Sequence, residues 1–449
     1  MRPHHILVLT LWLIASNHLH AESSDWLRHR GPNGSGRSDD GIRLPIHWDT
    51  DQNLKWLVPL PGPGQSSPIV IGNRIILTCW TGYGLDKEAP GDQHNLKYHL
   101  LCLDRRDGRQ IWSRTIQPKL PEHAYGGMLA LHGYATHTPV SDGQTIFAFF
   151  GKTGVFAFDL EGKQRWQTSV GSTLDSRRWG SSASPILHGD LLIVTASVED
   201  QALVAIHKGT GGVIWKQRGK DLANIWGTPA LAKLKNRTEL IVAAPFRLRA
   251  FDADTGEPLW YGESARDNTA GSGVMVHEGV AFVVGARFGG TTAIRAGGRG
   301  DVTDTWKLWG SRYRGRTATP ILHKQHLYWI FSRVAYCLQA DTGESLYRAR
   351  LKKTAATGGG PSRDDYASPV ASDELLYQLT QDGEMLVIEM GREFREITRN
   401  RFEGGGIFCA TPAISRGELF VRSSKHLYCV SNTGNYIVNS PRGRRSSRE

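Results

Sequence analysis

The sequence predicts an all-β protein folded as an eight-bladed β-propeller, with four antiparallel strands in each blade. Three observations support this prediction. A Ser-Pro or Thr-Pro phrase followed by an apolar strand recurs along the chain, each repeat holds four short strand-like segments, and the last repeat lacks its fourth segment. Four strands repeated with a period of about 40 to 50 residues are typical of propeller blades.

The recurring phrase marks the first strand of each blade. After a first gap of 71 residues, successive markers stand 43 to 49 residues apart, which predicts one blade per marker. The markers are Pro68, Pro139, Pro185, Pro229, Val274 in a slot where Pro is replaced, Pro320, Pro369 and Pro412.

The second strand of each repeat is apolar at nearly every position, as in residues 191–196. An alternating pattern would leave one face in water, whereas this continuous pattern indicates that neighbouring blades cover both faces. We therefore expect the blades to stack against one another around the ring.

A third strand, a polar turn with Gly and a fourth strand with an aromatic residue complete each repeat. The turn glycines suit positive backbone dihedral angles, and we expect the aromatic side chains to pack between blades. The glycines are Gly108, Gly162, Gly256, Gly343 and Gly434. The aromatic residues are Trp112, Trp166, Trp215, Trp260, Trp306 and Tyr347.

The eighth repeat contains only three strands, but a spare fourth strand precedes the first marker. Residues 53–60, which include Trp56, have the apolar and Trp pattern of a fourth strand. We predict that residues 54–60 pair with residues 426–431 and so close the ring. Closure would remove two exposed sheet edges.

The N-terminus resembles a secretory signal peptide. Arg2 precedes an apolar stretch, residues 6–15, and Ala21 stands where a signal peptidase would cut. An uncleaved anchor remains an alternative, because Leu19 is bulkier than the usual residue before the cleavage site. We expect a periplasmic or secreted protein.

These features divide the chain into four segments. Residues 1–21 form the signal peptide, 22–52 lead into the propeller, 53–434 form one propeller, and 435–449 form a basic tail that we expect to be disordered. We expect a monomer with no transmembrane segment. The net charge is +11, but the basic residues are scattered and no nucleic-acid-binding motif is present, which argues against a nucleic-acid partner.

The chain has five cysteines, and an odd count leaves at least one unpaired. Cys102, Cys337 and Cys429 occupy third-strand positions that are Ala in other repeats, so we expect buried core residues. Cys79 should face Leu100 and lie diagonal to Cys102. Diagonal neighbours are about 7 to 8 Å apart, too far for a disulfide without a change of register, so a Cys79–Cys102 bridge stays open.

These motifs resemble the pyrroloquinoline-quinone (PQQ)-like β-propeller repeat family, which includes quinoprotein alcohol dehydrogenases and the propeller lipoprotein of the outer-membrane barrel-assembly machinery. The resemblance covers residues 25–434. It rests on the turn Asp252-Ala253-Asp254-Thr255-Gly256-Glu257-Pro258-Leu259-Trp260, on Asp25-Trp26 with Arg30-Gly31-Pro32-Asn33-Gly34, and on Lys55-Trp56 and Ser66-Ser67-Pro68. The resemblance implies a propeller fold, and fold alone does not imply function.

The sequence departs from the family's enzymes and from its lipoprotein. It has no adjacent Cys-Cys pair and no Cys-x-x-Cys-His, and no motif places the enzymes' calcium ligands or catalytic Asp on this chain. Ala21 and Glu22 stand where the lipoprotein carries its acylated Cys. We therefore assign no catalytic residue and no metal ligand, and PQQ with calcium stays a cofactor that the resemblance implies only for an enzyme.

Candidate ligand-binding residues lie in the loops from each fourth strand to the next first strand and in those between second and third strands. Such loops gather on one face around the channel. Their Arg and Trp residues would suit a planar or carboxylate-bearing ligand through bidentate pairing and stacking. The candidates are Arg177, Trp179, Trp226, Arg266, Asn268, Arg287, Arg312, Arg314 and Arg333.

Two functions compete. The first is a non-catalytic binding or scaffolding module in the cell envelope, whose partner is an envelope protein or a small anionic ligand. The second is a PQQ- and calcium-dependent dehydrogenase that oxidises alcohols or sugars. A propeller hydrolase or lyase is a third alternative, and His123, His132 and His137 in one long loop leave a metal site open despite spacings that match no standard site.

Overall fold

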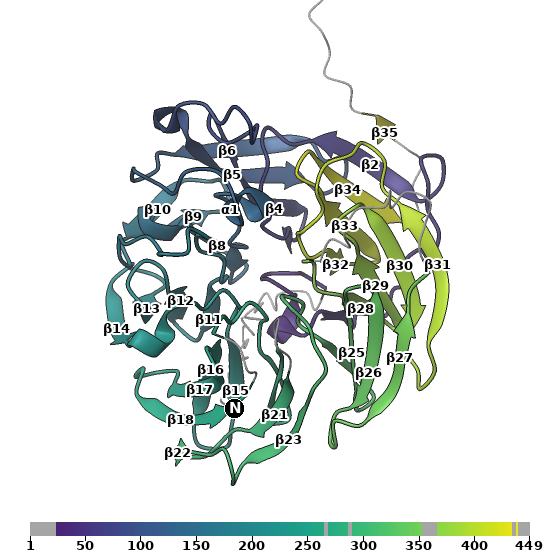
Figure 1. The fold of residues 1–449 in the computed structure, drawn as a ribbon. Helices are drawn as coiled ribbons and strands as arrows, with labels where there is room; N and C mark the ends of the chain where they lie inside the picture. The colour runs from purple at the N-terminus through teal and green to yellow at the C-terminus, as the bar shows by residue number, and fades with distance from the viewer. Residues whose placement is uncertain (1–23, 265–267, 286–289, 353–365, 433–436, 439–449) are drawn as a thin grey trace, which may run out of the picture.

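Each repeat folds as one antiparallel sheet, and eight such sheets are arranged in a ring (Figure 1). The computed structural model describes residues 24–264, 268–285, 290–352, 366–432 and 437–438. The predicted eight-bladed, four-stranded propeller is confirmed.

In every blade the first strand lies on the channel side and the fourth strand on the outer side. Blade 1 comprises β3 (Ile69–Ile71), β4 (Arg74–Thr81), β5 (Lys97–Asp104) and β6 (Gln110–Ile116). Blade 2 comprises β7 (Val140–Ser141), β8 (Thr145–Phe149), β9 (Val155–Asp159) and β10 (Gln164–Thr168). Blade 3 comprises β11 (Ile186–His188), β12 (Leu191–Ala196), β13 (Ala202–His207) and β14 (Val213–Arg218). Blade 4 comprises β15 (Ala230–Lys233), β16 (Thr238–Ala244), β17 (Arg247–Asp252) and β18 (Pro258–Glu263), with β22 (Gly300–Asp301) added outside β18.

The remaining blades follow the same order. Blade 5 comprises β19 (Met275–His277), β20 (Val280–Val284), β21 (Thr291–Arg295) and β23 (Lys307–Ser311). Blade 6 comprises β24 (Ile321–His323), β25 (His326–Phe331), β26 (Val334–Gln339) and β27 (Ser345–Arg350). Blade 7 comprises β28 (Val370–Ser372), β29 (Leu375–Leu379), β30 (Glu384–Glu389) and β31 (Arg395–Arg401), and blade 8 contains β32 (Ala413–Ser415), β33 (Glu418–Arg422) and β34 (His426–Ser431). The short helices are η1 (Pro32–Gly34), η2 (Gln93–Asn95), α1 (Leu129–His132), η3 (Gly151–Thr153) and η4 (Lys220–Leu222).

The N-terminal strand closes the ring as predicted. Strand β2 (Leu54–Pro59) pairs antiparallel with β34, and Trp56 lies opposite Cys429. Strand β35 (Ile437–Val438) pairs parallel with the outer edge of β2. These two residues lie in the tail that we expect to be disordered. The rest of the tail beyond them lies outside the described residues.

The fourth-strand Trp side chains join neighbouring blades, as expected. In five blades the indole Nε1 donates to a carbonyl in the third-to-fourth strand turn of the next blade. The pairs are Trp56 to Arg105 at 3.0 Å, Trp112 to Leu160 at 2.9 Å, Trp166 to Lys208 at 2.9 Å, Trp215 to Ala253 at 3.3 Å, and Trp309 to Ala340 at 2.8 Å.

One member of this Trp set differs from the prediction. In blade 5 the packed residue is Trp309, which lies opposite Ala293, whereas Trp306 is exposed. The cause is the longer connection from β21 to β23, which contains β22 and delays the fourth strand. In blade 4 Trp260 packs against blade 5 as predicted, while its Nε1 donates to Glu239 of its own blade at 2.7 Å.

The cysteines are all free, and their register differs from the expectation in one place. Cys79 pairs with His99 and not with Leu100, while Cys102 pairs with Ile76. The odd separation of residues 99 and 102 puts the two thiols on opposite faces of the sheet, in different core clusters. A Cys79–Cys102 bridge is therefore excluded by geometry. The core positions predicted for the third-strand cysteines are confirmed.

The segment that precedes the propeller plugs one end of the channel. Trp26 bridges to Val70 of β3, and β1 (Arg37–Ser38) pairs parallel with the innermost strand of blade 7. Figure 1 shows this purple segment inside the ring. Gly31 lies against the Trp26 ring at a φ of 61°, where an added Cβ would approach the ring to 2.5 Å. Glycine is thus required at this position by both space and backbone conformation.

Arg30 fixes the plug to the ring. Its side chain is buried, and all five of its N–H groups donate to backbone carbonyls. The acceptors are Gly34, Ser35, Thr319, Pro320 and Pro369, at 2.8 to 3.2 Å. One side chain therefore joins the plug to blades 6 and 7.

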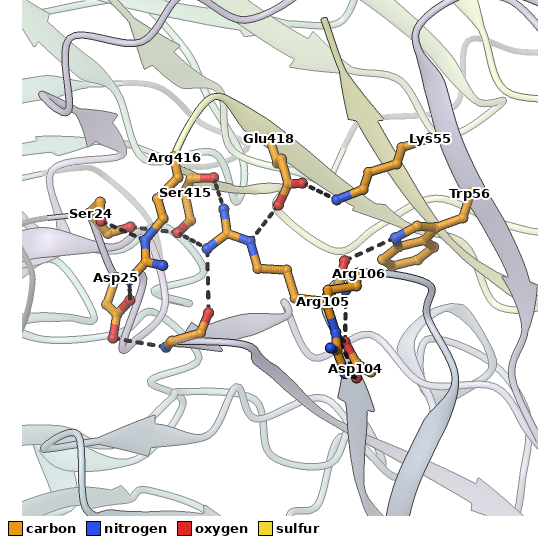
Figure 2. Close-up of polar contacts among 11 residues, drawn as sticks. Ser24, Asp25, Lys55, Trp56, Asp104, Arg105, Arg106, Ser415, Arg416 and Glu418 are labelled. Atoms are coloured by element: carbon orange, nitrogen blue, oxygen red, sulfur yellow. Dashed lines mark hydrogen bonds and ion pairs between the residues drawn. The ribbon is translucent and has the colours of Figure 1, made fainter. Parts of the chain in front are cut away.

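A polar network surrounds the junction of blades 1 and 8 (Figure 2). Glu418 of β33 accepts from Lys55 of the closing strand at 2.6 Å and also pairs with Arg105 of blade 1. Arg105 donates in addition to Ser415 Oγ at 3.1 Å, and its carbonyl accepts from Trp56. The junction thus combines the closing strand with side-chain contacts from both blades.

The same network holds the start of the plug. Ser415 Oγ donates to the carbonyl of Ser24 at 2.6 Å, and Arg416 Nε donates to Ser24 Oγ at 3.0 Å. Asp25 accepts from the backbone N–H of Gly72 at 3.0 Å. Plug and ring closure are therefore one connected structure.

Candidate functional site

The channel contains a cavity of about 930 Å³. The plug forms its floor, where His29 lies 3.4 Å from Ser67 Oγ. The connections between blades and the turn between β25 and β26 form its walls and mouth. The loops expected to gather on one face around the channel therefore do so.

The walls carry a ring of hydroxyl groups, which explains the recurring Ser-Pro and Thr-Pro phrase. The residue before each marker lines the cavity, and in five places its hydroxyl oxygen accepts from the backbone N–H of the equivalent residue in the preceding blade. The bonds run from Ser67 to Thr138 at 2.9 Å, Thr138 to Ser184 at 3.0 Å, Ser184 to Thr228 at 3.1 Å, Thr319 to Ser368 at 3.0 Å, and Ser368 to Thr411 at 3.0 Å.

A hydroxyl that accepts in such a bond still has its own proton to donate. Five accepting hydroxyls therefore stand around the cavity with O–H donors available to a ligand. In blade 5 this position is Gly273, whose missing side chain interrupts the ring.

Two tryptophans stand side by side at the mouth. The rings of Trp179 and Trp226 lie 4.9 Å apart at an angle of 45°, and both line the cavity. Trp226 Nε1 donates to the carbonyl of Gly180 at 2.7 Å, which ties the two connections together. Arg177 lies over the Trp179 ring at 5.3 Å and donates to Asn224 at 3.2 Å.

Arginines approach the mouth from two separate arcs of the ring. Arg177 comes from the connection between blades 2 and 3, and Arg314 and Arg316 from that between blades 5 and 6. Arg316 lies 5.6 Å from the Tyr366 ring, which also lines the cavity. Since three blades separate these connections, the two groups of cations face each other obliquely across the channel.

The structure brings together five of the nine candidates predicted from the sequence. Arg177, Trp179, Trp226, Asn268 and Arg314 all line the cavity. Arg312 is exposed and Arg333 is partly buried, and neither lines it. For these two the prediction that they reach the channel mouth is not supported by the geometry.

Arg266 and Arg287 lie outside the described residues. They remain predictions for the channel mouth.

Several cavity residues were not anticipated. His29 on the floor, the hydroxyl ring, Tyr366 and Cys409 all line the cavity. A Ser or Thr precedes every marker proline, and this repetition in the sequence could have indicated the hydroxyl ring. His29 had none, because nothing in its local sequence shows that the N-terminal segment enters the channel.

Burial, with Arg30 and Arg28 nearby, lowers the pKa of His29 to about 3, so its imidazole is neutral at neutral pH. No Asp or Glu occurs among the described residues that line the cavity. With three arginines and no carboxylate, the potential of the described lining is positive.

Calcium does not fit this lining. Calcium binds six to eight oxygen ligands, usually including carboxylates. The described lining supplies no carboxylate. Within the described part of the chain, no group of three or more His, Cys, Asp or Glu side chains is placed to hold a metal ion. The arginines and tryptophans suit a planar anion such as pyrroloquinoline quinone. The same residues do not suit the calcium ion that accompanies the quinone in the enzymes.

The three loop histidines are used in internal contacts. His123 pairs with Asp175 at 3.1 Å, and His132 Nε2 donates to the carbonyl of Trp179 at 2.6 Å. His137 Nε2 lies 2.9 Å from Ser181 Oγ. His132 therefore supports the position of Trp179 from behind.

Over the described residues, no helix combines the length and the apolar character that a membrane crossing requires. No curated protein sequence matches the chain.

Solved structures with the same fold are numerous but distant in sequence. BamB from Moraxella catarrhalis superposes with a TM-score of 0.57 at 14% identity, covering 85% of this chain and 98% of that one. Quinohemoprotein alcohol dehydrogenase from Comamonas testosteroni gives 0.64 at 10% identity, covering 93% and 82%. The computationally designed Ika8 protein gives 0.54 at 9% identity, covering 85% and 99%. At these identities the likeness shows the fold alone.

A protein-family comparison is more specific. The model described as outer membrane protein assembly factor BamB matches residues 43–174 and 96–330, which together span more than half of the chain. The chain therefore belongs to this BamB family of PQQ-like β-propellers.

Proposed function

We propose that the protein is a non-catalytic binding module of the cell envelope whose central cavity holds a small anion with a planar portion. The observation that carries this proposal is the cavity lining, which combines three arginines, two adjacent tryptophans and a ring of hydroxyl donors without a described carboxylate.

Each part of the lining suits a different part of such a ligand. Guanidinium groups pair with carboxylates through two parallel N–H bonds, and indole rings stack on planar groups. The hydroxyl ring adds neutral donors deeper in the cavity. Because the plug forms the floor of the cavity, the ligand would enter through the mouth and could not pass beyond the plug.

The envelope location is supported by two features. The family model is described as an outer membrane assembly factor, and residues 1–21 have the pattern of a secretory signal peptide. We propose that the mature propeller is periplasmic or secreted and monomeric, and that an envelope protein is the alternative partner at the mouth.

Calorimetry with naphthalene dicarboxylate tests the anion site, with the neutral naphthalene dicarboxamide as the control ligand. We expect the dicarboxylate to bind and the diamide to bind much more weakly. Arg314→Gln should lower the affinity roughly tenfold or more, since a charged hydrogen bond contributes about 1.5 to 3 kcal/mol. Arg312→Gln is the matched control, because Arg312 lies in the same connection but outside the cavity.

Absence of dicarboxylate binding, or equal losses of affinity in Arg312→Gln and Arg314→Gln, would overturn the proposal.

A second experiment addresses the dehydrogenase alternative. The protein is incubated with pyrroloquinoline quinone, with and without calcium, and dye reduction is followed with alcohols and sugars. We expect quinone uptake independent of calcium and no dye reduction, whereas calcium-dependent turnover would establish the dehydrogenase instead.

A further inference from the structure

The connection of residues 172–182 carries Arg177 and Trp179 and so forms part of the mouth. Its N-terminal end is hydrogen-bonded to the turn between the second and third strands of blade 3. The backbone N–H groups of Ser172 and Thr173 both donate to the carbonyl of Glu199, at 3.0 and 3.1 Å. The position of these mouth residues therefore depends on the segment around Glu199.

The Glu199 side chain lies behind the same connection and is buried, with 2% of its surface exposed. A small cavity of about 40 Å³ is lined by Glu199, His137, Thr173 and Ser181. Glu199 Oε2 and His137 Nδ1 are both buried, and neither has a hydrogen-bond partner among the described residues. The backbone N–H of Glu199 itself and the Ser181 hydroxyl favour an ionised carboxylate here, but burial outweighs them.

The charged groups around this small cavity do not neutralise Glu199. Lys152 donates to the carbonyl of Pro121, and His123 pairs with Asp175. Glu122 accepts from Tyr98 at 2.9 Å and, like Asp175, bears the same charge as Glu199. The titratable and charged groups that face Glu199 across the elements packed against it are Tyr98, Glu122, His123, Tyr134, His137, Lys152 and Asp175.

Burial, with Glu122 and Asp175 nearby, raises the pKa of Glu199 to about 7 from its ordinary value of 4.5. The folded position of residues 172–182 against Glu199 therefore favours a protonated Glu199 side chain. This preference is complete below pH 4.5 and is lost as the pH rises towards 7.

We propose that Glu199 is a positioning residue for the channel mouth, and that loss of its proton loosens the connection of residues 172–182 and weakens anion binding there. The binding part of this inference rests on the proposed function. The loosening of the connection does not, because it concerns the protein without ligand.

Hydrogen exchange of the backbone amides of residues 172–182 tests the loosening directly. Wild type and Glu199→Gln are compared at the same pH, so that the intrinsic pH dependence of exchange cancels. We expect equal protection near pH 4.5. At pH 8 the wild type should exchange at least about tenfold faster, since a full shift from 4.5 to 7 corresponds to roughly 300-fold.

Two control variants keep the test decisive. Glu384→Gln removes a buried carboxylate that is paired with Arg399 in blade 7, and it should behave as wild type. Glu199→Asp retains a titrating carboxylate and should retain the pH dependence. Identical exchange in wild type and Glu199→Gln at every pH would overturn the proposal.

The second readout is naphthalene dicarboxylate affinity between pH 5 and pH 8. It should fall with rising pH in wild type and stay nearly constant in Glu199→Gln. If wild type does not bind the dicarboxylate at any pH, the proposed function fails while the exchange experiment still decides the role of Glu199. If wild type binds with a pH dependence that Glu199→Gln shares, the positioning role fails and the anion site stands.

Discussion

The two ends of the central channel use arginine in opposite ways. At the closed end, Arg30 is 2% exposed and each of its five N–H groups donates to a carbonyl. At the open end, Arg314 is exposed and Arg177 makes one hydrogen bond, to Asn224, and one contact with an indole ring. At the closed end the guanidinium N–H groups all stabilise the fold, whereas at the open end guanidinium N–H donors remain for a ligand.

This difference shows why residue type alone could not separate structural from binding arginines. Arg30 and Arg314 are both arginines on connecting segments. What distinguishes them is how many donors the folded chain already satisfies. Substitutions at the closed end should therefore change stability, and those at the open end should change binding.

The largest expected effect is that of Arg30→Met. It removes the donors of three buried and two partly buried carbonyls, and each unsatisfied buried group costs about 1 to 3 kcal/mol. We expect the free energy of unfolding in urea to fall by at least about 4 kcal/mol. A loss below about 1 kcal/mol would break the distinction between the two ends.

The blade 1–blade 8 junction comes second. Glu418→Gln removes the carboxylate that pairs with Lys55 and Arg105, and it leaves two cations without a counter-charge in a largely buried site. We expect urea unfolding to show a loss of about 2 to 4 kcal/mol. Glu389→Gln, which breaks the exposed pair with Arg395, is the matched control and should cost less than about 0.5 kcal/mol. Similar losses in the two variants would contradict the special role of the junction.

The pH dependence of stability gives a third test. Burial, with His132 nearby, lowers the pKa of His137 to about 3, below its ordinary value of 6.5. As the pH falls below 6.5, the unfolded chain therefore takes up a proton that the folded protein resists, and stability is lost. His137→Gln should reduce the slope of unfolding free energy against pH between 6.5 and 3 by up to about 1.4 kcal/mol per pH unit. The exposed His277→Gln should leave the slope unchanged, and a common change in both would refute this explanation.

The smallest expected stability effect belongs to the open end. Arg314→Gln should change the free energy of unfolding by less than about 0.5 kcal/mol, because the side chain is exposed. The same variant is expected to lose roughly tenfold in dicarboxylate affinity. A loss of stability above about 1 kcal/mol would show that Arg314 is structural, like Arg30.

Much of the fold was predictable because it repeats. The marker prolines, the turn glycines and the aromatic fourth strands each recur, so one blade predicts the next, and the missing strand of blade 8 indicated the closure that β2 provides. Single events were harder. The delayed fourth strand of blade 5 moved the packed residue to Trp309, and the long β4–β5 hairpin set a register that placed Cys79 opposite His99.

The site was predictable only in part. Loop position identified Arg177, Trp179 and Trp226, since the repeat places those connections at the channel. The sequence does not show how deep a side chain lies within the channel. Arg312 and Arg314, two residues apart, were therefore predicted equally, although only Arg314 lines the cavity. His29 was missed because a long-range contact between the N-terminal segment and the ring determines its place.

The most direct measurement of the central claim is a crystal structure of the protein soaked with naphthalene dicarboxylate. We expect the ligand rings to lie against Trp179 and Trp226, with carboxylates that reach Arg177 on one side and Arg314 or Arg316 on the other. A ligand ordered elsewhere on the propeller, with these arginines uncontacted, would contradict it.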